Sequence, residues 1–490
     1  MVRAWAISGM LLVIGSGAMA GLWPAWHEDA RAMIMPCSIE RQPTAQYVGS
    51  PSCSNQSCHG QSSEHPTGSE RQTWIERDPH SKALAVLHNE DSTRMMLALR
   101  KSDPSRPLHA YQDPSCLRCH AVSYTHSSGE DNNSKTQLRE GVSCEACHGP
   151  AERWLTEHYL ATWKNRNGEE KKSLGFAPTK ELGGRIELCA GCHIGSGDRE
   201  VNHDLIAAGH PRLAFEYTRF HYAPHYGKHW TERESNPAFE VRAWFVGQVA
   251  SMRRVVGLLQ TRLETNQANR PWPELAEMSC YACHQGIGKQ RTRSLAGLRA
   301  EHATGLPGWN LWYFSLVEVL ERQGPLLFPG TTTPKLASLQ ELLRLMRTTP
   351  GQTGQLLKLS AQAQEELAQW QKLLEGKQVH APAARALLHD IAGHALITGG
   401  DPAVETLRDY DWDYVTQHYL ACAALVHAHG EQDAVEWKSA KAIVQQLRLA
   451  LKFPDEAGIV RHNSPRDYDP EQAKRLFQDL RRLAAEGGSK

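Results

Sequence analysis

The C-terminal part of the chain is dominated by apolar residues that recur at three- and four-residue steps. This pattern predicts helices over residues 309–322, 335–346, 355–375, 384–397 and 414–429. Glycine and proline break the pattern at 329–330, 399–402 and 430, and Asp401 followed by Pro402 resembles a helix cap. Helices joined by short loops pack as antiparallel neighbours. We therefore expect residues 301–490 to form an α-helical bundle.

The pattern is weaker between residues 47 and 300. Helical periodicity is present at 81–87 and 239–263, whereas the polar runs at 129–136 and 164–175 are typical of exposed loops. We expect short helices joined by loops, with little sheet. Both parts of the chain therefore point to a mainly α fold.

The first residues have the features of an export signal. A basic Arg3 precedes an apolar run, which ends in a small-x-small triplet at 18–20. We expect a signal peptide at 1–20, a leader at 21–46, and export to the periplasm or another extracytoplasmic compartment. The apolar run is nearly long enough to span a bilayer. If it is not cleaved, it would tether the protein to a membrane.

Composition excludes one class of partner and raises a question about the interior. Lys+Arg and Asp+Glu both number 54, so no net field attracts nucleic acid, and we expect none to bind. Aromatic residues are 7% and apolar residues 40% of 490 residues, which is lean for the cores of a chain this long. Something other than side chains is therefore expected to fill part of the interior.

Cysteine and histidine explain that shortage. Ten of the twelve cysteines fall in five close pairs, and a histidine follows every pair. The five sites are Cys53, Cys58 and His59; Cys116, Cys119 and His120; Cys144, Cys147 and His148; Cys189, Cys192 and His193; and Cys280, Cys283 and His284. Five histidines in these positions by chance would have odds on the order of one in a million.

Only one of four chemistries accounts for the histidine. A disulfide, a zinc site and a redox dithiol all use cysteine pairs, but none of them fixes the residue that follows. In haem c attachment each thiol bonds one vinyl group, and the next residue lies under the porphyrin where an imidazole binds iron. We therefore predict five covalent haem c groups. Four residues separate Cys53 from Cys58, so the backbone must bulge there.

The supply of residues favours histidine as the second axial ligand. Residues 41–302 contain four methionines against twelve histidines outside the five sites. Two imidazoles give a lower potential than an imidazole and a thioether. The remaining Cys422 lies in an apolar helical pattern and is expected to be a small buried residue, while Cys37 lies in the leader.

Three motifs resemble a known family. YVGSPSCSNQSCHG at 47–60, PHSKALAVL at 79–87 and GVSCEACHGP at 141–150 resemble the multihaem cytochromes of the cytochrome c-554/c-prime type, which include the tetrahaem acceptor of electrons from hydroxylamine oxidoreductase. The likeness covers roughly residues 47–285. It implies a haem-organised domain at 47–300 in which His80 ligates the third haem and His158 the first.

The resemblance also implies further ligands. VNHDLIAAGHPRLAFEY at 201–217 resembles longer multihaem cytochromes in which both histidines, here His203 and His210, look like ligands. His109, just ahead of the second pair, is a fifth candidate. The relative's second haem lacks a distal protein ligand, so the iron at His120 is either open or closed by His109 or His126.

The favoured function is electron transfer rather than catalysis. Five haems would pass electrons between redox partner proteins, which requires no substrate pocket. The alternative is an oxidoreductase that acts on a small nitrogen or sulfur compound at one open iron. Its best support is the segment 219–234, where His221, His225 and His229 offer acids and bases. A scaffold or sensor that uses the helical tail is the third class.

Overall fold

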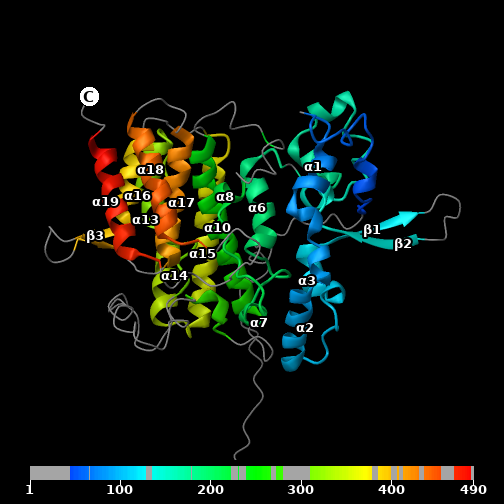
Figure 1. Cartoon of the computed structure of the whole chain (residues 1–490), viewed down its shortest axis with the longest axis horizontal. Coiled ribbons are helices and arrows are strands. Elements are labelled where there is room, and N and C mark those ends of the chain that lie inside the picture. The colour runs from blue at the N-terminus through cyan, green and yellow to red at the C-terminus, as the bar shows by residue number, and fades with distance from the viewer. Residues whose placement is uncertain are drawn as a thin grey trace, which may run out of the picture. The chain divides into compact units, whose positions relative to one another are not determined.

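The computed structural model describes residues 45–65, 67–127, 135–177, 179–221, 230, 239–265, 272–279, 309–377, 384–398, 405–407, 412–429, 435–453 and 468–486. Over these residues the protein is mainly α-helical, as predicted, with two short antiparallel hairpins (Figure 1). The hairpins are β1 (Val122–Ser127) with β2 (Lys135–Glu140), and β3 (Leu396–Thr398) with β4 (Glu405–Leu407). None of the described helices combines the length and the apolar character needed to cross a membrane.

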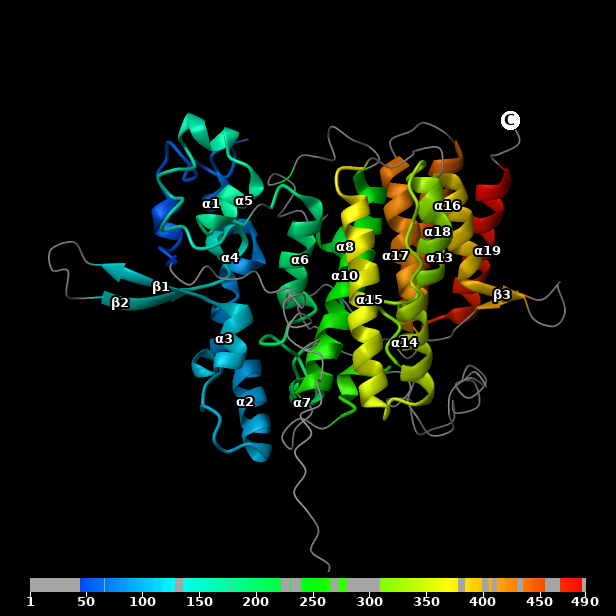
Figure 2. The same ribbon diagram turned by 180° about the vertical axis from the view of Figure 1, so that it is seen from behind.

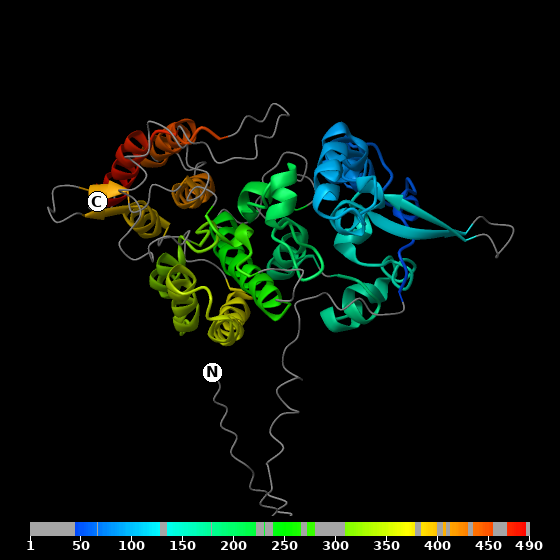
Figure 3. The ribbon, with the colours of Figure 1, turned by 90° about the horizontal axis from the view of Figure 1, so that it is seen from below.

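The C-terminal helices follow the predicted periodicity. They are α13 (Val317–Leu327), α14 (Ala337–Thr348), α15 (Thr353–Leu374), α16 (Ala384–His394), α17 (Trp412–His429), α18 (Val435–Ala450) and α19 (Pro470–Glu486). α15 packs against α14 and against α10 (Phe239–Glu264), while α19 packs against α16 and α18. Figure 2 shows these helices side by side, and Figure 3 shows them nearly end-on. The helix predicted at 239–263 is therefore confirmed.

Two predicted helices have different ends. α13 begins at Val317 rather than at 309, because the indoles of Trp309 and Trp312 donate hydrogen bonds outside the helix, to Glu277 and to the Phe215 carbonyl. The helix predicted at 384–397 ends at His394, since β3 begins at Leu396. Side chains and strand pairing thus override the local period.

Two shorter predictions are wrong. The helix expected at 81–87 is instead a pair of 3₁₀ turns, Pro79–Lys82 and Ala85–His88. The loop expected at 164–175 contains α5 (Gly168–Ser173), which Asn167 and Glu170 start with a reciprocal capping box. The loop predicted at 129–136 lies mostly outside the described residues, as do the cap at 401–402 and the export signal at 1–20.

One large apolar core joins most of the helices. It runs from Leu182 on α6 (Leu182–His193) to Ala484 on α19, and its fully buried aromatic residues include Trp244, Phe245 and Trp370. Cys422 is buried in it, as predicted. The core continues across residue 300, so packing alone does not mark the boundary proposed there.

The N-terminal region has little core of its own. Its α-helices are α1 (Glu70–Arg77), α2 (Glu90–Ser102), α3 (Pro114–His120), α4 (Cys144–His148) and the short α5. The buried apolar cluster among them consists of Leu87, Met96, Leu99 and Ala110. α2 packs against α7 (His203–Ala208), and α6 packs against α10. Short helices linked by loops agree with the architecture expected from the sequence.

Candidate haem-binding sites

The second, third and fourth cysteine pairs each form the last turns of a helix. α3, α4 and α6 all end on the histidine that follows the pair. Positions i and i+3 share one face of a helix, so the two thiols of a pair lie on the same side. The imidazole comes next, where a porphyrin bound to those thiols requires an iron ligand.

The first pair closes its wider spacing with a tight turn. Cys53 ends a 3₁₀ turn, and the backbone amides of Cys58 and Gly60 then donate to the Asn55 carbonyl at 2.9 and 3.0 Å. A Cβ on Gly60 would lie 2.0 Å from the Ser54 carbonyl oxygen, so only glycine fits this return. The bulge that the spacing predicts is therefore present.

Three of these histidines each face a second histidine from a distant part of the chain. The ring centroids are 6.3 Å apart for His59 and His158, 6.3 Å apart for His120 and His210, and 5.9 Å apart for His80 and His193. The ring planes are nearly parallel in the first pair, at 18°, and nearly perpendicular in the other two, at 86° and 79°.

This spacing fits one metal ion between two imidazoles. With a metal–nitrogen bond of about 2 Å, and a ring nitrogen roughly 1.1 Å from its own centroid, opposed ligands have centroids roughly 6 Å apart. Rings in van der Waals contact would be closer when stacked face to face. A disulfide or a zinc knuckle at the cysteines would give no reason for this repeated histidine pairing.

Hydrogen bonds fix which ring nitrogen is left for the metal. The Nδ1 atoms of three rings lie 2.7 to 3.3 Å from backbone carbonyl oxygens: His158 with Leu155 and Trp154, His120 with Ala83, and His210 with Pro211. A carbonyl can only accept, so each Nδ1 carries the proton and donates. Nε2 is then the nitrogen that carries the lone pair a metal ion would bind.

Two other rings have carboxylates as their Nδ1 partners. His59 Nδ1 lies 2.9 Å from Glu70, and His80 Nδ1 lies 3.0 Å from Asp78. Burial alone would raise the pKa of Glu70, but the hydrogen bonds from His59 and from backbone amides outweigh it and lower that pKa. An anionic acceptor makes the imidazole a stronger donor to a metal. Neither Glu70 nor Asp78 was predicted from the sequence.

Burial keeps the imidazoles of His193 and His120 neutral. It lowers the pKa of His193 to about 4, with smaller contributions from His80 and His120, and it also lowers the pKa of His120. Both imidazoles are therefore uncharged near neutral pH, which is the form that binds a metal ion.

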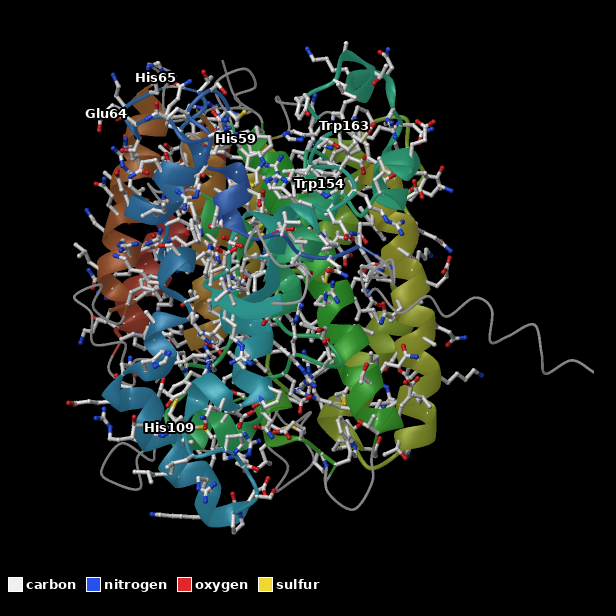
Figure 4. All side chains as sticks on the ribbon, turned by 90° about the vertical axis from the view of Figure 1, so that its right-hand side faces the viewer. His59, Glu64, His65, His109, Trp154 and Trp163 are labelled. Carbon is white, nitrogen blue, oxygen red and sulfur yellow. The ribbon has the colours of Figure 1, made fainter. Side chains whose placement is uncertain are left out.

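The third site has aromatic surroundings. The ring of His148 stacks on Phe176, with centroids 5.9 Å apart and planes at 21°. Phe176 in turn meets Trp154 and Trp163 edge to face. In Figure 4 both tryptophans lie in the upper part of the view, as does His59. Planar apolar rings of this kind suit a porphyrin edge.

The thiols place the sites in an order that differs from the sequence. Cys53 of the first site hydrogen-bonds Cys144 of the third, and this bond lowers the pKa of Cys53. Cys119 of the second site hydrogen-bonds Cys192 of the fourth, and lowers the pKa of Cys192 to about 6.

The third and fourth sites also adjoin. Burial raises the pKa of Cys147, and the charges of Cys189 and Cys192 raise it further. Among the four described sites, the order in space is therefore first, third, fourth, second.

A buried glutamate joins the first and third sites. Glu145 stands between the two cysteines of the third pair, and its carboxylate accepts backbone hydrogen bonds from Val48 at 3.0 Å, Gly49 at 2.6 Å and Ala151 at 2.7 Å. It thereby holds the segment that leads into Cys53. No sequence signal distinguishes this glutamate from a solvated one.

Two sequence-predicted ligands have other contacts in the described structure. The ring of His109 stacks on Tyr111, with centroids 5.0 Å apart. In Figure 4 His109 lies low in the view, whereas His59, His65 and Glu64 lie in its upper part. His203 begins α7, and its backbone amide donates to Glu274 at 2.9 Å.

The partner of His80 also differs from the one that the resemblance implies. The resemblance assigns His80 to the third site, but the structure places its ring beside His193 at the fourth. At the second site it is His210 that faces His120, rather than His109. The side chain of His126, the fifth pair with Cys280, Cys283 and His284, and residues 222–229 lie outside the described structure.

Comparison with known proteins agrees with the motifs. Residues 52–149 match the family model described as cytochrome c554 and c-prime. Cytochrome c-554 of Nitrosomonas europaea is 27% identical over 157 residues, which is 31% of this chain and 58% of that relative. The chain thus spans less than two thirds of the relative's length. No solved structure matches. The resemblance to this family is confirmed, and it implies covalently bound haem c.

Proposed function

We propose that the protein is an exported multihaem c-type cytochrome, which carries electrons through five covalently bound haems with mostly bis-histidine ligation. The observation that carries the proposal is the opposition of three histidine pairs at 5.9 to 6.3 Å, each beside a cysteine pair. The family match supports haem c and electron transfer in general. The number of haems and their ligands are our proposal.

The geometry supports a particular set of ligands. We assign His59 and His158 to the first haem, His120 and His210 to the second, and His193 and His80 to the fourth; His148 and His284 serve the third and fifth haems. His203 suits the fifth haem, because Glu274, which binds its amide, lies just before Cys280. His109 remains a candidate from the sequence alone.

The order of the sites supports a path for electrons. Haem, when bound, supplies a reversible one-electron change at iron. The chain's own residues set the spacing and the potentials: cysteines of neighbouring sites adjoin, and imidazole ligands hold the potentials low. Carboxylates assist His59 and His80, whereas carbonyls assist His120 and His210. The second haem is therefore expected to have the highest potential of these three.

The proposal also covers location and partners. Export through the segment at 1–20 would place the protein in the periplasm or another extracytoplasmic space, and retention of that segment would tether it to a membrane. The partners are redox proteins, and nucleic acid is not among them. We retain the division into a leader, a haem domain at 47–300 and a helical domain at 301–490.

Mass and electron paramagnetic resonance test the proposal together. We expect the mature protein to carry the mass of five haems, and its oxidised form to give mainly low-spin signals. His158→Ala and His210→Ala should each convert one low-spin iron to high spin, while His88→Ala, whose ring stacks on Tyr111, should not. A mass equal to the bare processed chain would refute the proposal. A high-spin iron in the wild type that turns over nitrite or hydroxylamine would favour the enzyme.

A further inference from the structure

A short extended segment touches two of the candidate sites. Residues 210–216, which we call the ligand strap, connect α7 to α8 (Tyr217–His221) and have no helical or strand structure. The strap carries His210, which faces His120 at the second site. It also carries Phe215, whose ring stacks on His193 of the fourth site at 5.5 Å and 23°. Its position therefore affects both sites.

An ion pair ties the strap to the C-terminal helices. The guanidinium of Arg212, two residues after His210, forms a two-pronged salt bridge with Asp413 at the start of α17. The Asp413 side chain is 3% exposed and that of Arg212 is 12% exposed. Arg212 also lies over the ring of Trp312, 5.7 Å from its centroid. A buried bidentate pair of this kind fixes both position and orientation.

Two further side chains bind the strap's backbone. The hydroxyl of Tyr313 accepts from the Phe215 amide and donates to the Leu213 carbonyl, both at 3.2 Å. The indole of Trp312 donates to the Phe215 carbonyl at 2.9 Å. Buried backbone groups need such partners. Here the side chains of Trp312 and Tyr313 form the hydrogen bonds that backbone groups would form in a helix or a strand.

We propose that the C-terminal helical region positions the ligand strap, so that His210 reaches the second iron and Phe215 covers the fourth site. Asp413, Tyr313 and Trp312 are positioning residues, because each of them binds the strap through Arg212, Leu213 or Phe215. The inference rests on the proposed function, since it takes His210 as an iron ligand. It gives the long C-terminal region a role in haem ligation.

The test uses the full-length holoprotein with Asp413→Asn and Tyr313→Phe. Each change should alter the low-spin signal of the second haem, or convert a fraction of it to high spin. Reduced variants should then bind more carbon monoxide than the wild type does, by up to one equivalent per chain. Asp390→Asn is the matched control, because it breaks an ion pair with Arg322 on the outside of the same helical region. It should leave the spectra unchanged.

The outcomes separate this inference from the proposed function. Wild-type spectra and carbon monoxide binding no greater than that of the wild type, in both variants, would overturn the inference. If Asp413→Asn does not accumulate, Tyr313→Phe decides, because it removes one hydroxyl and keeps the ring. Failure of the proposed function would give a different result, because His210→Ala would then leave the wild-type signals unchanged.

Discussion

The helical region and the N-terminal region differ in what stabilises each of them. The helical region shares one apolar core that extends from Leu182 to Ala484, with Trp244 and Trp370 fully buried. Among the described residues of 45–177, the buried apolar side chains are the small cluster around Met96 and Leu99 and a few others, such as Val122 and Trp154. Hydrophobic burial stabilises a fold roughly in proportion to the apolar area removed from water. On the proposed haem assignment, the contrast teaches that porphyrin faces supply the interior of the N-terminal region.

Preventing haem attachment should have the largest effect on the difference between the two regions. In protein made without haem attachment, we expect residues 45–177 to lose their fold, because little apolar surface remains to bury. Hydrogen exchange read by mass spectrometry should show fast exchange throughout α1 and α2. The amides of α15 and α17 should stay protected. Slow exchange in α2 of the haem-free protein would contradict this account.

A cavity in the helical region should have the next largest effect. The Trp370 side chain is fully buried, and its indole donates to the Pro334 carbonyl at 2.9 Å. Trp370→Ala should lower the free energy of unfolding of this region by about 3–5 kcal/mol. Leu449→Ala, at a residue 75% exposed, should change it by less than about 0.5 kcal/mol. Chemical denaturation measures both, and equal effects would count against a shared core.

Removing a carboxylate beside a ligand should have a smaller effect, confined to the potentials. Asp78→Asn and Glu70→Gln each replace an anionic acceptor of an imidazole proton, so the oxidised iron loses stabilisation. The midpoint potential of the matching haem should rise by roughly tens of millivolts. Glu64→Gln removes an equal charge from a side chain 82% exposed and should shift the titration little. A fall in potential for either variant would refute this role.

The smallest effect concerns the pH dependence of stability. Burial raises the pKa of Glu216 from its ordinary 4.5, against hydrogen bonds from Thr218 and Arg219. The folded protein therefore holds a proton that the unfolded chain has released, and stability falls as pH rises upward from about 4.5. Glu216→Gln should flatten that fall in melting temperature. A variant with the wild-type slope would show that Glu216 does not titrate there.

The sequence predicts the parts of this fold that depend on local pattern. Apolar residues at three- and four-residue steps predict α14, α15 and α17. Asn167 and Glu170 have the spacing of a capping box, which is a local signal for the start of α5. The histidine that follows each cysteine pair likewise predicts haem attachment.

The rest depends on contacts between distant segments. The approach of His80 to His193, and of Arg212 to Asp413, is set by packing across many residues. Asp78, Glu70 and Glu145 act through the groups that the fold brings to them, so their residue type alone carries no signal.

The interleaving of the histidine pairs has a consequence for assembly. On the proposed assignment, the fourth iron takes a ligand, His80, that emerges before its own cysteines, whereas the first and second irons wait for His158 and His210 further along the chain. If the chain is exported from its N-terminus, the first and second irons therefore lack their second axial ligand until His158 and His210 have followed.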